Sequence, residues 1–145
     1  MLKTLLSEGV KILEDWKIKI AALWLFPLMA FLASAVLLFM EPGVLAELVE
    51  EGTIEGMQVG PELLVASAVI DILVPLVMVF LSLALKDSVN RWLNIVVGGV
   101  YAVLMVITLV EELVAPKGYV VLMLIAAVVA SVLIVWYAWK SKKKA

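Results

Sequence analysis

One acidic residue lies in the middle of a long apolar run of this sequence. Asp71 comes eight positions after Leu63, which begins an apolar stretch that continues to Leu85. Eight residues of helix rise about 12 Å, so the carboxyl group is expected near the centre of a hydrocarbon layer about 30 Å thick. An ionised Asp there costs roughly 2.5–3.5 kcal/mol. This cost predicts that Asp71 turns toward other helices, is protonated, or both.

Polar neighbours share the expected helix face of Asp71. The face is formed, at spacings of four, seven and four residues, by Ser67, Asp71, Met78 and Ser82. Pro75 lies four residues after Asp71 and cannot donate the helical hydrogen bond to its carbonyl group. We therefore expect a free acceptor and a kink at this point.

Tyr101 is the expected partner of Asp71, because it lies nine residues beyond Trp92 and so about 13 Å into the next helix. Two interpretations remain open. In the first, a proton- or cation-responsive ligand site is built from Asp71, Tyr101, Ser67 and the free carbonyl beside Pro75. In the second, a protonated Asp71 hydrogen-bonds to Tyr101 or Ser67 and joins two helices, which is worth about 0.6–2 kcal/mol.

A second group with binding chemistry consists of Asn90, Arg91, Trp92 and Asn94. The guanidinium group of Arg91 can bind lipid phosphate while the indole ring of Trp92 anchors the helix at the interface. Asn90 and Asn94 are four residues apart and can cap a helix or bind loop backbone. One interpretation is recognition of a lipid headgroup or a partner at this interface, and the other is plain anchoring.

Catalytic chemistry has few candidates, because the chain contains no Cys and no His. The Ser residues have no evident paired base, and Asp71 has no second acid with which to form a dyad. We therefore expect no catalytic residue, no cofactor and no metal site. An acidic group of eight Glu residues could attract or hold Ca²⁺, but it lacks EF-hand spacing, and a solvated acidic face is the alternative.

The composition places the chain in lipid. Of its 145 residues, 66% are hydrophobic and 17% charged, with a mean hydropathy of +1.18, whereas soluble domains are about 45–50% apolar and about 25% charged. This excludes a soluble enzyme, a disordered chain and a nucleic-acid-binding domain.

Four apolar runs reach the length of about 20 residues that a membrane-spanning helix needs. They cover residues 20–40, 63–85, 92–110 and 119–139. Short connections containing Pro and Gly favour antiparallel neighbours. The predicted fold is all-α: one integral membrane four-helix up-down bundle over residues 1–145.

The charges predict an orientation. Ten of the eleven basic residues lie before the first run, between the second and third, or after the fourth, and Lys117 alone lies on the other side with the eight Glu residues. By the positive-inside rule both termini are cytoplasmic, in the cell (plasma) membrane. Before the first run, residues 2–16 alternate apolar and charged positions at helical spacing, which predicts an interfacial amphipathic helix on the inner surface.

Small residues four positions apart, such as Gly98 with Ala102 and Ala127 with Ser131, allow close helix packing. They fit contacts within the chain and a homo-oligomer equally well.

Several short sequence segments occur in a fixed order along the chain. They are Ala22-Leu23-Trp24, Val79-Phe80-Leu81-Ser82-Leu83-Ala84-Leu85, Asn90-Arg91-Trp92-Leu93-Asn94-Ile95 and Ile134-Val135-Trp136-Tyr137-Ala138-Trp139. In this order the chain resembles a family of small prokaryotic four-helix integral membrane proteins whose common domain has no assigned function. The resemblance implies the architecture and supplies no activity. Relatives with a Gly-Asp pair in the first helix differ from this chain, which has Ala33-Ser34-Ala35-Val36 there.

These patterns predict a multi-pass membrane protein that is not an enzyme, with membrane lipids as partners. A small-molecule or ion binding or transport protein with an intramembrane site around Asp71 is the first expectation. A non-catalytic accessory or assembly subunit of a larger membrane complex, and a lipid- or envelope-associated protein, are the alternatives.

Overall fold

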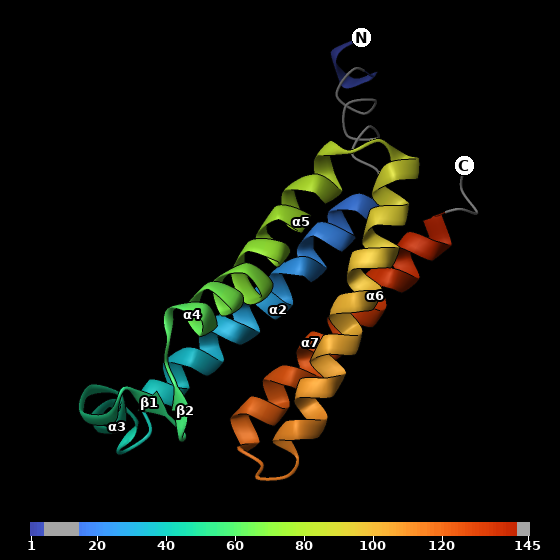
Figure 1. Ribbon diagram of the computed structural model, residues 1–145. Helices are drawn as coiled ribbons and strands as arrows, with labels where there is room; N and C mark the ends of the chain where they lie inside the picture. The colour runs from blue at the N-terminus through green and yellow to red at the C-terminus, as the bar shows by residue number, and fades with distance from the viewer. Residues whose placement is uncertain (5–14, 142–145) are drawn as a thin grey trace.

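The computed structural model describes residues 1–4 and 15–141, and four long helices dominate this part of the chain (Figure 1). The first is α2 (Asp15–Phe39), which is followed by a short helix, α3 (Val44–Glu51), and a hairpin of β1 (Thr53–Ile54) and β2 (Met57–Gln58). The second consists of three consecutive segments: α4 (Pro61–Ser67), η1 (Ala68–Leu73) and α5 (Val74–Ala84). The third and fourth are α6 (Asp87–Glu112) and α7 (Gly118–Lys140).

The four apolar runs are confirmed as helices, and each is long and apolar enough to cross a membrane. Within the described residues the model is all-α apart from the two-residue strands of the hairpin. The amphipathic helix predicted over residues 2–16 falls mainly on residues 5–14, which lie outside the described part of the chain.

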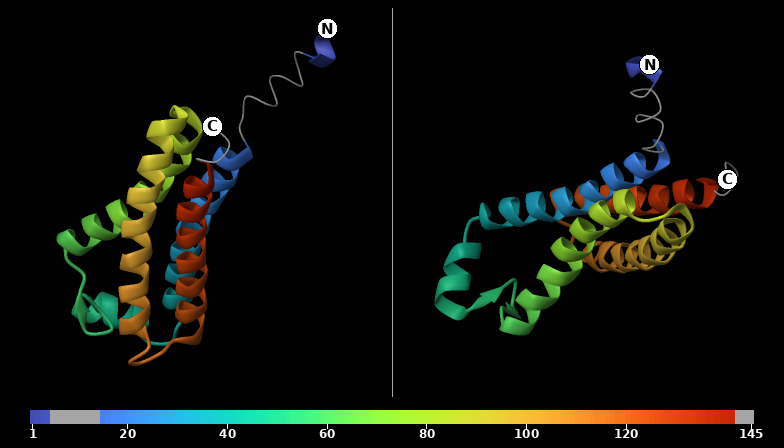
Figure 2. Two further views of the ribbon diagram at one scale, coloured as in Figure 1. Left: turned by 90° about the vertical axis from the view of Figure 1, so that its right-hand side faces the viewer. Right: turned by 90° about the horizontal axis from the view of Figure 1, so that it is seen from above.

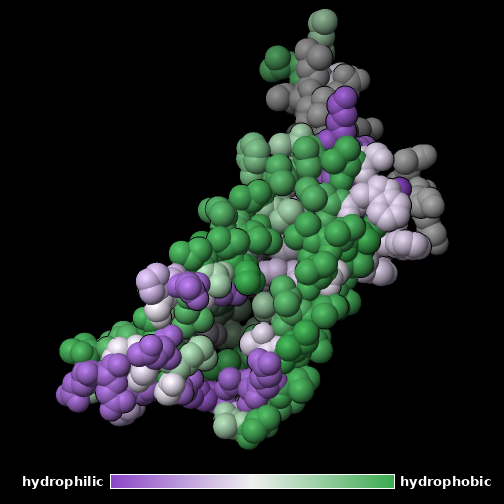
Figure 3. Space-filling model, viewed as in Figure 1, coloured by the Kyte–Doolittle hydropathy of each residue, from purple (hydrophilic) through white to green (hydrophobic). Residues whose placement is uncertain are grey.

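Helix α7 lies in the middle of the bundle, with α2 along one side and α6 along the other, and α5 packs against α2 (Figures 1 and 2). Successive long helices run in opposite directions, so α2 begins and α7 ends at the same end of the bundle. Helices α5 and α6 approach each other closely only near their connecting turn, and α4 diverges from α6. This divergence leaves a hollow between α4 and the α6–α7 hairpin, visible in Figure 3 and called the α4–α6 hollow below.

The second long helix changes its hydrogen bonding where Pro75 requires it. Proline has no amide hydrogen, and its ring clashes with the carbonyl group four residues earlier. The chain responds with the π-helical segment η1, in which the amide of Val74 donates to the carbonyl oxygen of Val69 five residues back. Such segments are rare and occur often at functional sites. The expected disturbance beside Asp71 thus takes the form of a π-helical turn, which separates α4 from α5.

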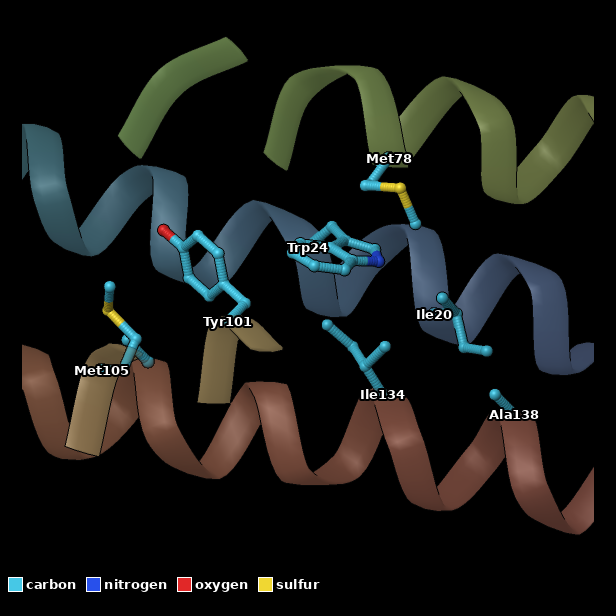
Figure 4. Close-up of a cluster of buried hydrophobic side chains, with 8 residues drawn as sticks. Ile20, Trp24, Met78, Tyr101, Met105, Ile134 and Ala138 are labelled. Carbon is cyan, nitrogen blue, oxygen red and sulfur yellow. The ribbon is translucent and has the colours of Figure 1, made fainter. Parts of the chain in front are cut away.

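The core of the bundle surrounds Trp24 (Figure 4). Its indole ring is completely buried and meets side chains from each of the other long helices. These neighbours include Met78 of α5, Tyr101 of α6 and Ile134 of α7, with Ile20 of α2 beside them. All four helices therefore contribute to one cluster.

Small residues line the inside of α7, where Ala127, Ala130, Ser131 and Ala138 are buried. Large apolar residues such as Met29, Phe80 and Val132 are more than half exposed on the outside. In lipid, exposure of apolar side chains costs nothing, and small residues let helix backbones approach closely. Small residues inside and large apolar residues outside are typical of a helical bundle that is surrounded by hydrocarbon.

Helix α6 packs tightly against α7 at Gly98, which is one of the predicted small-residue positions. A Cβ atom built there would lie 3.1 Å from Cγ2 of Ile134 and 3.3 Å from Cγ2 of Val135, whereas one built on the adjacent Gly99 meets nothing within 4 Å. The contact between the two helices thus depends on the absence of a side chain at one position only.

We predict that Gly98→Ala lowers the free energy of unfolding by about 1–3 kcal/mol, because Ile134 and Val135 must shift to admit the methyl group. Gly99→Ala is the matched control and should unfold like the wild type. Denaturant titration in detergent micelles, followed by circular dichroism, measures the difference. Equal stabilities of the two variants would show that α6 and α7 are not in close contact at Gly98.

Candidate functional site

Asp71 lies in η1, partly buried, at the divergence of the second long helix from α6. Within the described chain its carboxylate forms no hydrogen bond and no ion pair. The hydroxyl group of Ser67, four residues earlier at the end of α4, also makes none. Both oxygen-bearing groups are thus available on the side of the bundle where the helices separate.

Tyr101 is buried on α6, with 3% of its surface exposed, and its ring packs edge-on against Trp24 with centroids 5.6 Å apart. Figure 4 shows its hydroxyl group pointing away from Trp24. This hydroxyl has no hydrogen-bond partner among the described residues, and no side-chain oxygen there is both fully enclosed and unpartnered. The hydroxyl group must therefore be open to its surroundings.

Asp71 is near enough to Tyr101 for its carboxylate charge to act on the tyrosine hydroxyl group, although no hydrogen bond joins them in the described chain. Pro75 is buried one turn from Asp71, at the start of α5. Ser67, Asp71 and Pro75 therefore follow one another along the second long helix, and Tyr101 belongs to α6. The helix-joining hydrogen bond of the second interpretation is not formed among the described residues.

A separate network of buried polar side chains joins the helices near the end of the bundle where α2 begins. The indole N–H of Trp24 donates to Oδ1 of Asn94 at 2.8 Å, and the hydroxyl group of Ser82 donates to the same oxygen at 3.2 Å. The amide of Asn94 donates to Oδ1 of Asn90 at 2.6 Å, and the amide of Asn90 donates to the carbonyl oxygen of Ser82 at 2.5 Å. Three of the four long helices, α2, α5 and α6, are joined by these bonds.

The four residues predicted as one interfacial group, Asn90, Arg91, Trp92 and Asn94, lie on different faces of α6. Asn90 and Asn94 are fully buried in the bundle and face inward, because one face of α6 packs against its neighbours. Arg91 and Trp92 lie on the outer faces, with the guanidinium carbon 5.6 Å from the indole centroid. Trp24 was not among the residues predicted to bind Asn94. The inward position of the two Asn side chains is indicated in the sequence by their four-residue spacing within an apolar helix, which predicts one shared face.

At the α3 end of the bundle, Lys117 binds acidic residues from three parts of the chain through its side chain and its backbone amide. Its Nζ atom lies 2.7 Å from Oε2 of Glu41 and forms an ion pair with Glu55. The hydroxyl group of Tyr119 donates to the other oxygen of Glu41 at 2.6 Å, and the backbone amide of Lys117 donates to Glu112 at 3.0 Å. Lys117 thus ties the turn after α2 and the β-hairpin to the α6–α7 turn.

The acidic residues of this end have structural partners. Glu47 accepts hydrogen bonds from the amide of Gly56 at 2.8 Å and the hydroxyl group of Thr53 at 2.9 Å, which lower the pKa of its carboxyl group. Hydrogen bonds from Lys117 and Tyr119 lower the pKa of Glu41. Over residues 1–4 and 15–141, no group of three or more acidic side chains is arranged to hold a metal ion.

Comparison with protein-family models, with curated proteins and with solved structures finds no match for this chain. Its function must therefore be argued from the groups described above.

We predict that Asn94→Leu destabilises the bundle by about 1–3 kcal/mol, because the Trp24 N–H and the Asn90 amide group lose acceptors or donors in the core. Thr108→Val, a polar-to-apolar change at an exposed position of α6, is the matched control and should have little effect. Denaturant titration in micelles tests both. A wild-type stability for Asn94→Leu would mean that the network does not hold the helices together.

A pH effect follows from the lowered pKa of Glu41. A carboxyl group with a lowered folded-state pKa stabilises the fold above its unfolded-state pKa, and this contribution is lost as the pH falls through the folded-state pKa. Glu41→Gln should therefore have a lower thermal unfolding midpoint than wild type at neutral pH, and the two should converge in acid. Glu51→Gln, at an exposed position of α3, should unfold like wild type throughout. A gap between wild type and Glu41→Gln that persists in acid would contradict the role of this ion pair.

Proposed function

We propose that this chain is a multi-pass integral membrane protein of the cell membrane, with both termini cytoplasmic. The four candidate spans support the first part, and the position of ten of eleven basic residues at one end supports the orientation. At that end Lys140 lies 4.8 Å from the ring centroid of Trp136, and Arg91 stacks on Trp92. These basic and aromatic pairs are suited to lipid headgroups.

We propose further that the protein binds a small molecule or ion beside Asp71, and that transport would use the same site. One observation carries this proposal: an intramembrane carboxylate without a hydrogen-bond or ion-pair partner in the described chain lies near a partnerless tyrosine hydroxyl group. Ionisable groups inside a membrane are costly, and they commonly mark ligand, proton or ion pathways. The π-helical turn at Asp71 favours the same location.

The proposed activity is not catalytic. Asp71, Ser67 and Tyr101 offer one acid and two hydroxyl groups, with no general base paired to a nucleophile. The resemblance to small prokaryotic four-helix membrane proteins of unassigned function agrees with this architecture and adds no reaction.

A non-catalytic accessory subunit is the second candidate, and the incomplete contact between α4 and α6 favours it. A helix of a larger membrane complex, or a second copy of the chain, would fit along this side. Binding of that kind would not depend on the charge of Asp71.

We predict that native mass spectrometry of the protein, released gently from membranes, detects a retained small molecule or ion that is lost in Asp71→Asn. The substitution keeps the shape of the side chain and removes its charge, and Glu62→Gln in the first turn of α4 is the matched control. Retention by wild type and Glu62→Gln only would support the ligand site. A mass spectrum unchanged by Asp71→Asn would reject it and turn attention to protein partners.

A further inference from the structure

The α4–α6 hollow has surface of both kinds around it. Figure 3 shows hydrophobic surface on its α6 side, hydrophobic and hydrophilic surface on its α4 side, and hydrophilic surface at its α3 end. Asp71 is the only charged residue within the four apolar runs of the sequence, and it lies in η1, where α4 separates from α5. A ligand that fills this space must combine an apolar body with a group that satisfies a carboxylate.

The described side chains near Asp71 supply fewer oxygen atoms than a protein cage for Ca²⁺ uses. Ca²⁺ takes six to eight oxygen ligands and Mg²⁺ requires near-octahedral geometry. Asp71, Ser67 and Tyr101 supply one carboxylate and two hydroxyl groups, and no triad of acidic side chains is formed in the described chain. The donor set therefore suits a cation that needs only a few acceptors.

An alkylammonium group meets this requirement, because it carries a full positive charge and N–H donors on an apolar chain. Its donors would satisfy the carboxylate of Asp71 and the hydroxyl oxygen of Tyr101 or Ser67, none of which has a partner in the described chain. The charge is complementary at long range as well. Eight Glu residues against Lys117 give the α3 end a negative potential that concentrates cations at the mouth of the hollow.

We infer that the α4–α6 hollow binds an amphipathic organic cation, with its ammonium group on Asp71 and its apolar body between α4 and α6. This inference rests on the proposed ligand site at Asp71 and names the class of its ligand. Access is from the side of the bundle, where α4 and α6 diverge, so the apolar body can enter from the lipid phase.

The test uses octylammonium as the probe and the full chain in nanodiscs of uncharged phosphatidylcholine, so that anionic lipid does not compete for the cation. Calorimetric titration should detect saturable binding to wild type and to Asp15→Asn, which removes an exposed carboxylate at the opposite end of the bundle. Asp71→Asn should weaken it at least about tenfold, since a charge-assisted hydrogen bond is lost. Octanol, which has the same chain and no charge, should bind no more tightly than octylammonium binds to Asp71→Asn. Circular dichroism establishes that Asp71→Asn keeps its helices.

Equal binding of octylammonium to wild type and Asp71→Asn, or equal binding of octanol, would overturn the inference. The inference would also be overturned if native mass spectrometry detected a second copy of the chain, or a retained lipid, that octylammonium does not displace. If octylammonium fails but another mass is lost in Asp71→Asn, the ligand site stands and its ligand class is wrong. If neither the binding of octylammonium nor the retention of any other mass depends on Asp71, the ligand site itself is rejected.

Discussion

The hydrogen bond from the Trp24 indole to Asn94 is the interaction on which the bundle depends. Lipid tails are as apolar as leucine, so the hydrophobic effect does not hold spanning helices together, and packing and polar bonds must do so. Trp24 supplies both: its N–H joins α2 to α6, and its ring contacts Tyr101 edge-on while Met78 and Ile134 belong to the same cluster. One side chain thus sets the relative positions of four helices.

The second long helix divides the molecule into regions with different tasks. Its inner part, α5, packs on α2 and contributes Ser82 to the polar network. Its outer part, α4, diverges from α6, and the change occurs at η1 because Pro75 cannot take part in regular helical bonding. On this helix, Ser82 of the polar network and Asp71 of the proposed ligand site therefore lie on either side of one proline.

Much of this arrangement could be predicted from the sequence. Runs of about 20 apolar residues lead to four helices, and equal depth along two helices brings Asp71 near Tyr101. The four-residue spacing of Asn90 and Asn94 indicates a shared face, but the partners of that face, Trp24 and Ser82, could not be obtained this way, because the rotation of a helix depends on its neighbours. The partners of Lys117 were also unpredictable, since Glu41 and Glu55 reach it through tertiary folding of the α3 end.

The two ends of the bundle are held together by different kinds of interaction. Near the termini, α2, α5 and α6 are bonded to one another through buried amides and the indole ring, while at the α3 end an ion-pair group around Lys117 connects the loops. Between them, η1 lacks the regular spacing of helical bonds. The second span is therefore least regular beside Asp71, between two ends that are each held by side-chain bonds.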